Sequence, residues 1–222
     1  MRERARGDDA TRAVVRSIAT LGYGGGDATV LDTLNVDDRI AALATAASAF
    51  AGRGEPDRAL DAYDHALRAA APGLRDGSPA LRALAAGGNN LAAALEERTG
   101  RTERQTRGMV DAARAALAYW KRAGGWIEEE RAEYRLSCSL LNAGAAREAI
   151  DAARRCIAVC DANDAPAFER FFGAAALARA QHDAGDRAAF ERSRDDARAY
   201  FDRLPDDERD ACEAELRALD AR

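Results

Sequence analysis

The sequence has few aromatic residues, few β-branched residues and no long apolar run. Aromatic residues make up 6% of the 222-residue chain, and alanine supplies much of its apolar content. Alanine-rich segments with few β-branched residues suit helices that pack closely through small side chains. We therefore expect an all-α protein with almost no strand.

Two further absences concern targeting and membranes. No segment reaches the roughly 18 uninterrupted apolar residues that a membrane-spanning helix requires. The opening stretch "MRERARGDDATRAVV" contains charges but no apolar core of a secretory signal. These features predict a cytoplasmic, bacterial protein with no membrane partner, in which the four cysteines stay reduced.

The chain also has no excess of positive charge. Its formal net charge is −5, and Lys121 is its only lysine, so arginine supplies nearly all of its positive charge. Nucleic-acid-binding proteins usually carry a basic balance or a basic stripe, and we expect no such partner here. The arginine content reflects either genomic base composition, which we favour, or recognition of phosphate or carboxylate by planar guanidinium groups.

Motifs of catalysis are missing as well. His65 and His182 are the only histidines, and neither stands at a nucleophile spacing to serine or cysteine; HExxH and GxSxG are absent. The stretch "LGYGGGDAT", residues Leu21–Thr29, lacks the GK[ST] or GxGxxG of a phosphate-binding loop, so it predicts a flexible loop. The sequence thus predicts a protein that is not an enzyme and has no cofactor.

The cysteines give only a weak indication of a metal site. Cys156 and Cys160 are one helical turn apart, and Cys138 falls on the partner helix. A zinc site needs three or four ligands at suitable spacing. Buried cysteines that act as small apolar residues are the commoner explanation, so we expect no bound metal.

What the sequence does contain is a series of helical pairs separated by glycine turns. Each pair consists of two segments of helical length with apolar residues on one face. The turn glycines recur at intervals of 41 to 46 residues: Gly54, Gly100, Gly144 and Gly185. The pattern predicts helical hairpins over 36–73, 78–125, 126–164 and 165–204. The first begins with Asp caps, and Pro56 suits the first turn of its second helix.

These hairpins define the predicted domain organisation. Residues 1–36 form an N-terminal helical or loop extension, and residues 37–204 form the repeat domain. Pro205 then begins a last helix over 205–222, whose acidic first turn suits the positive end of the helix dipole. Its mostly polar face is typical of a helix that caps an open stack.

The hairpin from Ile40 to Pro72 resembles the tetratricopeptide repeat. Matching positions are occupied by small, aromatic and turn residues: Phe50, Gly54, Ala59, Tyr63, Ala66 and Pro72. The third hairpin is similar through Leu136, Leu140, Gly144, Ala149 and Ile157. In the fourth, Ala189 and Phe190 are out of place, and the second has extra residues between its helices. The spacing also exceeds the 34 residues of the standard repeat.

This resemblance implies a right-handed superhelical stack of antiparallel helix hairpins. A non-repetitive helical bundle is the alternative, because alanine-rich hairpins can form either. In a stack, the first helix of each pair lines a concave groove, and the periodic glycine turns favour that architecture.

Within this groove, the sequence is similar to the carboxylate clamp of peptide-binding tetratricopeptide domains. Asn89, Arg131 and Arg135 fall at matching places, whereas Ala44 and Ser48 replace a lysine and an asparagine of the pattern. Tyr134, Arg179 and His182 complete the predicted peptide-binding residues. An amide can pair with a peptide backbone, and arginine presents a fork to a carboxylate. The alternative is a solvated helix face on which Arg131 pairs with Glu128.

The groove prediction depends on the segment "GGNNLAAALEE", Gly87–Glu97. Glycine costs a helix interior about 1 kcal/mol relative to alanine, so this stretch predicts either a helix break or a packing requirement. We expect Gly87 and Gly88 to admit a neighbouring helix closely and Asn89 to face the groove. Trp120 and Trp126 are expected in the core of a corner, the alternative being an exposed anchor for a partner.

The predicted function is a non-catalytic protein- or peptide-binding scaffold. Its partner is a protein or peptide, with an acidic group or a C-terminal carboxylate as the recognised feature. The alternative is a ligand-sensing or homo-oligomerising module, for example a homodimer, whose alanine-rich surfaces pair with another copy. An enzyme is the third and least supported hypothesis, because no acid–base or nucleophile set stands out.

Overall fold

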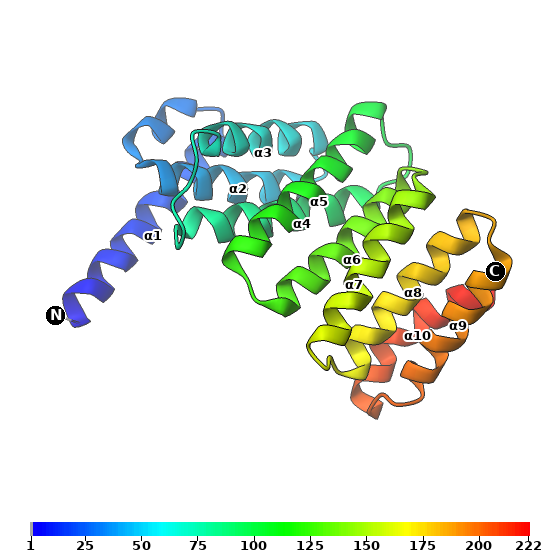
Figure 1. Ribbon diagram of the computed structural model, residues 1–222. Coiled ribbons are helices and arrows are strands. Elements are labelled where there is room, and N and C mark those ends of the chain that lie inside the picture. Colours follow the sequence, from blue (N-terminus) through cyan, green and yellow to red (C-terminus); the bar gives the residue numbers. More distant parts are fainter. Residues whose placement is uncertain (1) are drawn as a thin grey trace. The chain divides into compact units, whose positions relative to one another are not determined.

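The computed structural model describes residues 2–222, with side chains described from Ala10 onward, and these residues are all helical or irregular (Figure 1). The all-α prediction is confirmed. The helices follow the chain as α1 Arg2–Gly24, η1 Ala28–Thr33, α2 Val36–Gly52, α3 Pro56–Ala70, α4 Pro79–Glu96, α5 Glu103–Ala123, α6 Trp126–Asn142, α7 Ala146–Ala162, α8 Ala167–Asp183, α9 Arg187–Phe201 and α10 Asp206–Asp220. No helix among the described residues is long and apolar enough to cross a membrane.

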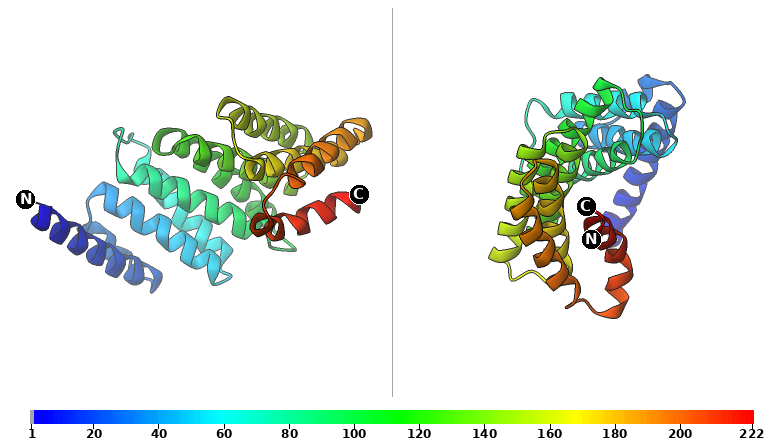
Figure 2. Two further views of the ribbon diagram at one scale, coloured as in Figure 1. Left: turned by 90° about the horizontal axis from the view of Figure 1, so that it is seen from below. Right: turned by 90° about the vertical axis from the view of Figure 1, so that its right-hand side faces the viewer.

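The helices pack as sequential hairpins within two compact units. The first unit ends at Ala123 and the second comprises Gly124–Arg222. In the first unit, α2 pairs with α3 and α4 with α5, and α2 also packs on α4. In the second, α6 pairs with α7 and α8 with α9, while α7 packs on α8 and α10 lies against α8 and α9. The antiparallel pairs can be followed by colour in Figure 2.

Turn residues explain where the hairpins bend. Gly54, between α2 and α3, has a φ of +75°, a conformation that costs little only for glycine. The other three predicted turn glycines share this conformation: Gly100, Gly144 and Gly185. Pro56 is the first residue of α3, where its missing N–H group breaks no helical hydrogen bond. The predicted glycine turns are thus confirmed by their backbone geometry.

Two local predictions near the N-terminus are wrong. Asn35 caps α2, because its side chain accepts a hydrogen bond from the backbone N–H of Asp38 at 2.9 Å; the aspartates lie inside the first turn. The predicted loop over Leu21–Thr29 is also shorter than expected. Helix α1 continues to Gly24, and Asp27 then caps η1 by accepting from the N–H of Thr29 at 3.0 Å.

The two glycines of "GGNN" lie in an unbroken α4 and serve packing. A Cβ atom on Gly88 would lie 2.3 Å from the hydroxyl of Tyr63 and 2.7 Å from the carbonyl oxygen of Ala112. One on Gly87 would lie 3.0 Å from the Cβ of Ala44. Neighbouring helices therefore approach α4 at a distance that only glycine permits, as the sequence predicted. The close contact also lets the buried Tyr63 hydroxyl donate to the carbonyl of Leu84 at 2.9 Å.

Candidate peptide-binding site

The six predicted site residues fall on three helices. Asn89 lies on α4 of the first unit, half-buried, and its side chain has no hydrogen-bond partner among the described residues. The neighbouring Asn90 is exposed. The other five lie on α6 and α8 of the second unit: Arg131, Tyr134, Arg135, Arg179 and His182. The assembly of Asn89 with the arginines of the second unit stays a prediction.

Tyr134 and Arg179 come together around Cys138. Tyr134 and Cys138 are one turn apart on α6, and a terminal nitrogen of Arg179 donates to the Cys138 sulfur at 3.1 Å. The Tyr134 ring packs edge-on against Phe172 of α8, with centroids 5.6 Å apart. Burial, and then the neighbouring Cys138, raise the pKa of the Tyr134 hydroxyl well above its usual range. The tyrosine therefore remains neutral beside the guanidinium group.

Glu215 of the C-terminal helix occupies this cluster. The Nε atom of Arg179 lies 3.0 Å from a carboxylate oxygen of Glu215, and each side chain is only 19% exposed. The two atoms face each other as an ion pair without hydrogen-bond geometry. Burial disfavours the charge on Arg179, but Cys138, Glu215 and Tyr134 together raise its pKa above the usual value. Arg179 thus stays charged and already holds a carboxylate.

Packing of α10 brings Glu215 to this position. Cys212 and Leu219 on α10 are fully buried in a cluster with Phe171 of α8, and Leu216 packs against the same cluster. Glu215 is not among the residues predicted from the sequence, because the last helix has the mostly polar face of a cap. The apolar residues Cys212, Leu216 and Leu219, spaced at helical intervals, were the signal of a packing face beside which Glu215 lies.

Arg131 forms its ion pair with Glu169 on α8. Its guanidinium group contacts the carboxylate of Glu169 at 2.5 and 3.5 Å, which raises the pKa of Arg131. Glu128, the partner expected for a solvated face, also raises the pKa of Arg131 through its charge, and its side chain accepts from the backbone N–H of Gly125 at 2.9 Å. Arg131 remains 60% exposed, whereas Glu169 is buried. Arg135 lies one turn further along α6 and is half-buried.

Beneath Arg131 lies a buried carboxyl group that the sequence did not predict. Glu130 is 1% exposed, and the thiol of Cys156 donates to it at 3.0 Å. Burial raises the pKa of Glu130 to about 7. Cys156 and Cys160 are both fully buried, as expected for packing residues. Helical periodicity gives a buried face but does not reveal that a glutamate will occupy it.

The two histidines contact residues outside the cluster of Tyr134, Cys138 and Arg179. His182 is exposed, lies 2.9 Å from the carboxylate of Asp183 and 3.1 Å from the guanidinium group of Arg222, and meets the Phe190 ring edge-on. These contacts connect His182 to α9 and the C-terminus, whereas Tyr134, Cys138 and Arg179 connect α6 with α8. The Nδ1 atom of His65 lies 3.2 Å from the hydroxyl of Tyr23.

The tryptophans are neither core residues nor fully exposed anchors, the two alternatives that the sequence offered. Trp120 and Trp126 are both half-buried, and the guanidinium group of Arg82 lies 5.0 Å from the centre of the Trp120 ring. Each ring is thus partly covered and partly open to solvent. A cation over an aromatic face at this distance contributes about 0.5–1 kcal/mol at an exposed site.

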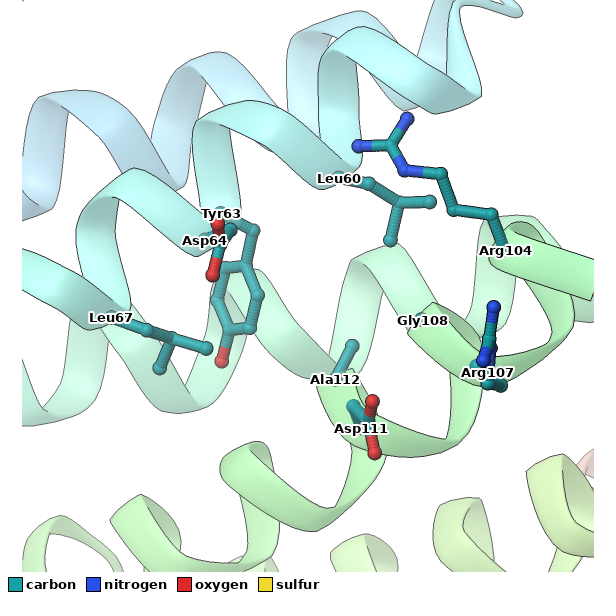
Figure 3. A pocket seen from close by; sticks show the side chains of 9 residues that line it. All are labelled: Leu60, Tyr63, Asp64, Leu67, Arg104, Arg107, Gly108, Asp111 and Ala112. Carbon is teal, nitrogen blue, oxygen red and sulfur yellow. The ribbon is translucent and has the colours of Figure 1, made fainter.

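A hollow lies on the first unit, between α3 and α5 (Figure 3). This cavity of about 430 Å³ is floored by Leu60, Tyr63, Gly108 and Ala112. On its rim, Arg104 of α5 pairs with Asp57 at 3.1 Å and Asp61 at 2.5 Å on α3. The Tyr63 hydroxyl is already bonded to Leu84, and the rim charges are of both signs. This hollow therefore presents charges of both signs around an apolar floor.

Comparisons with known proteins support the architecture. A crystal structure of nearly identical TPR-like repeats from a Podosopora anserina protein, described provisionally as a kinesin light chain, matches with a TM-score of 0.58 and 18% identity. The match covers 86% of this chain and 93% of that one. A single-substitution variant of the same protein matches equally well. No protein-family model and no curated protein sequence matches the chain. The predicted tetratricopeptide-like hairpin fold is confirmed by the structural match, which says nothing about function.

Proposed function

From this TPR-like fold, we propose that the protein is a non-catalytic scaffold that binds an acidic segment of another protein on the second unit. The observation that carries the proposal is the ion pair between Arg179 and Glu215, 3.0 Å apart. A site that already holds a carboxylate from its own chain has the chemistry to hold one from a partner.

The surroundings of Arg179 favour such a contact. Its side chain is 19% exposed, so a carboxylate that reaches it leaves most of its water behind. Interactions between charges strengthen as water is excluded, and arginine remains charged under all such conditions. The ring of Tyr134 and the edge of Phe172 add apolar surface next to the charge. This combination suits an acidic side chain or a C-terminal carboxylate that is flanked by apolar residues.

The other predicted residues extend the proposed surface. Arg131 keeps 60% of its side chain exposed, so its outer nitrogen atoms can contact a second carboxylate while Glu169 holds the inner side. Arg135 follows one turn along α6. His182 is proposed to contact one end of a longer bound segment, and the contribution of Asn89 stays a prediction.

A non-catalytic role is supported by the position of the groups with shifted pKa values. Glu130 is 1% exposed and bonded to Cys156, and the raised pKa of Tyr134 keeps its hydroxyl neutral and unreactive. A general acid or base must reach a proton of the substrate within hydrogen-bond distance. Glu130 is sealed from solvent, so it does not meet this requirement.

A peptide library tests the proposal. The probe is a pool of random 12-residue peptides, displayed once with free C-terminal carboxylates and once with amidated C-termini. Selected peptides are then measured by fluorescence anisotropy against the wild-type chain, Arg179→Gln, Arg131→Glu and the control Arg154→Gln. Arg154 is 64% exposed on α7 and pairs with Asp151 of the same helix.

We expect selection of peptides rich in Asp or Glu, and loss of about tenfold or more in affinity for Arg179→Gln, the usual effect of removing a buried charged contact. Arg131→Glu should abolish binding, and Arg154→Gln should leave it unchanged. Selected peptides that bind all three variants equally would contradict the assignment. Enrichment in the free-carboxylate pool alone would identify the chain terminus as the recognised group.

A further inference from the structure

Helix α1 exposes an apolar stripe on the first unit. Val14 is 58% exposed, Ile18 is 62% exposed and Leu21 is 75% exposed, and Val15 beside them is 45% exposed. The first three are separated by four and three residues, so they form one line along the helix. Single exposed apolar residues are ordinary, but a contiguous line of large ones marks an interaction surface.

The opposite face of α1 is already fixed on the first unit. Ala19 is 3% exposed, and Arg12 and Arg16 both contact the carboxylate of Asp38 on α2, at 3.1 and 3.6 Å. Rotating α1 to bury the stripe would break these ion pairs and expose Ala19. The stripe therefore stays exposed to solvent while α1 keeps its ion pairs with Asp38.

The residues beside Val14, Ile18 and Leu21 are uncharged and small, and the two arginines on the Val15 side, Arg12 and Arg16, are already paired with Asp38. Four of them are exposed: Ala10, Thr11, Ala13 and Ser17. A partner with charged side chains opposite this surface would lose hydration without gaining an ion pair. Small flanking residues also allow two helices to approach closely. The surface thus suits an apolar helix face with equally uncharged flanks.

The stripe itself is such a face. Its spacing of four and three residues is the repeat by which two helices pack with their side chains interlocked. The midpoint between Val14 and Leu21 falls beside Ile18. A two-fold axis at that point would set Val14 against Leu21 of the partner subunit, a larger residue against a smaller one, at both ends of the contact.

We propose that α1 binds α1 of a second copy of this chain, antiparallel, with the two-fold axis between Ser17 and Ile18. The contact is isologous, as in most homodimers, since the same patch is used by both copies. Two stripes of four residues lie at the small end of specific interfaces. The dimer is therefore expected to dissociate on dilution. It uses no residue of the cluster around Arg179, so it stands or falls separately from the proposed peptide binding.

Sedimentation velocity over a range of protein concentrations tests the dimer. The full chain should pass from monomer to dimer as concentration rises. Ile18→Asp should weaken the association by about tenfold or more, the usual effect of losing a central interface residue. Ile127→Asp is the control, because Ile127 is 39% exposed and lies on α6 of the second unit. Circular dichroism confirms that both variants fold.

Cross-linking through introduced cysteines tests the orientation. The four native cysteines are buried, so Val14→Cys and Leu21→Cys supply the accessible thiols. In the antiparallel pair, the two copies of residue 14 lie about 10 Å apart along the axis, from the rise of 1.5 Å per residue. A disulfide requires Cα atoms within about 7 Å. A mixture of the two variants should therefore form a disulfide dimer under mild oxidation, whereas each variant alone should not.

Three results would overturn the proposal. The first is a monomer at every concentration, and the second is cross-linking of Val14→Cys with itself, which requires parallel helices. The third is a wild-type monomer that sediments with phosphatidylglycerol vesicles through the stripe, with binding lost in Ile18→Asp. That result would assign the stripe to a membrane surface.

Discussion

Arg179 on α8 and Glu215 on α10 face each other at 3.0 Å, so the C-terminal helix contributes a carboxylate to the cluster that the sequence predicted as a binding site. The contact is supported by the burial of Cys212 and Leu219 on the same helix. Helix α10 therefore does more than end the stack. Its Glu215 carboxylate contacts the Arg179 guanidinium group, on which the proposed recognition of an acidic partner depends.

This ion pair should couple the two residues measurably. In a double-mutant cycle of Arg179→Met and Glu215→Gln, we expect a coupling free energy of about 1–2 kcal/mol, because the pair is mostly buried but keeps some solvent. Urea denaturation of the four proteins gives the value. The control cycle uses Arg217 and Glu213, an exposed pair on α10, for which about 0.3–0.5 kcal/mol is expected. Equal coupling in both cycles would mean that burial adds nothing to the Arg179–Glu215 pair.

The same contact makes Glu215 a competitor of the proposed ligand. Glu215→Gln removes its charge and should raise the affinity of selected acidic peptides by about threefold to tenfold, which corresponds to about 0.7–1.4 kcal/mol. Fluorescence anisotropy with the peptides selected on the wild-type chain provides the measurement. Glu213→Gln on the exposed side of α10 should change the affinity little. A weaker complex with Glu215→Gln would show that Glu215 supports the ligand rather than competes with it.

Gly88 should be intolerant of even one added methyl group. A Cβ atom there would meet the Tyr63 hydroxyl at 2.3 Å and the Ala112 carbonyl oxygen at 2.7 Å, and the second of these belongs to the backbone. Overpacking costs about 1–3 kcal/mol, which outweighs the gain of about 1 kcal/mol in helix propensity. Gly88→Ala should therefore lower the free energy of unfolding.

Gly52 provides the matched control for this prediction. It ends α2, and no atom lies within 4 Å of its added Cβ. Gly52→Ala should raise stability by about 0.4–1 kcal/mol, because the added methyl group meets nothing and reduces the freedom of the unfolded chain. Thermal unfolding distinguishes the two variants. A stabilised Gly88→Ala protein would mean that α4 can shift away from α3 and α5 without loss.

Local signals explain why so much of the fold could be predicted. The turn at Gly54 depends on the left-handed conformation of one residue, and the start of α3 depends on Pro56. Gly88 is predicted to serve close packing, because glycine destabilises a helix interior and a close helix contact compensates for that cost. Each of these follows from sequence neighbours within a few turns, which is the range over which helical periodicity and turn chemistry act.

Long-range pairing explains what could not be predicted. The partner of Arg131 is Glu169, on another hairpin, and nothing in the spacing of the two residues distinguishes it from Glu128. Glu215 reaches Arg179 only because α10 packs on α8. Glu130 lies on a buried face, although a charged residue is usually expected at the surface. Such pairs depend on tertiary packing, which a single sequence does not encode in its local pattern.

Glu130 gives the stability of the protein a pH dependence of its own. Burial raises the pKa of its carboxyl group from 4.5 in the unfolded chain to about 7 in the folded protein. Between these values the folded state binds a proton that the unfolded state releases, so stability should fall as the pH rises from about 4.5 to 7 and then level off. The conversion of 1.36 kcal/mol per pKa unit sets an upper bound of about 3 kcal/mol for this loss.

Glu130→Gln should remove that dependence, because an amide has the shape of the protonated carboxyl group and does not ionise. The variant should match the wild type near pH 5 and exceed it in free energy of unfolding at pH 8, by about 1–3 kcal/mol. Urea denaturation at both pH values measures the difference, with Asp151→Asn on the exposed side of α7 as the control. If Glu130→Gln were less stable than the wild type at pH 8, the carboxylate would have to be charged and stabilised in the folded protein, and the raised pKa would be wrong.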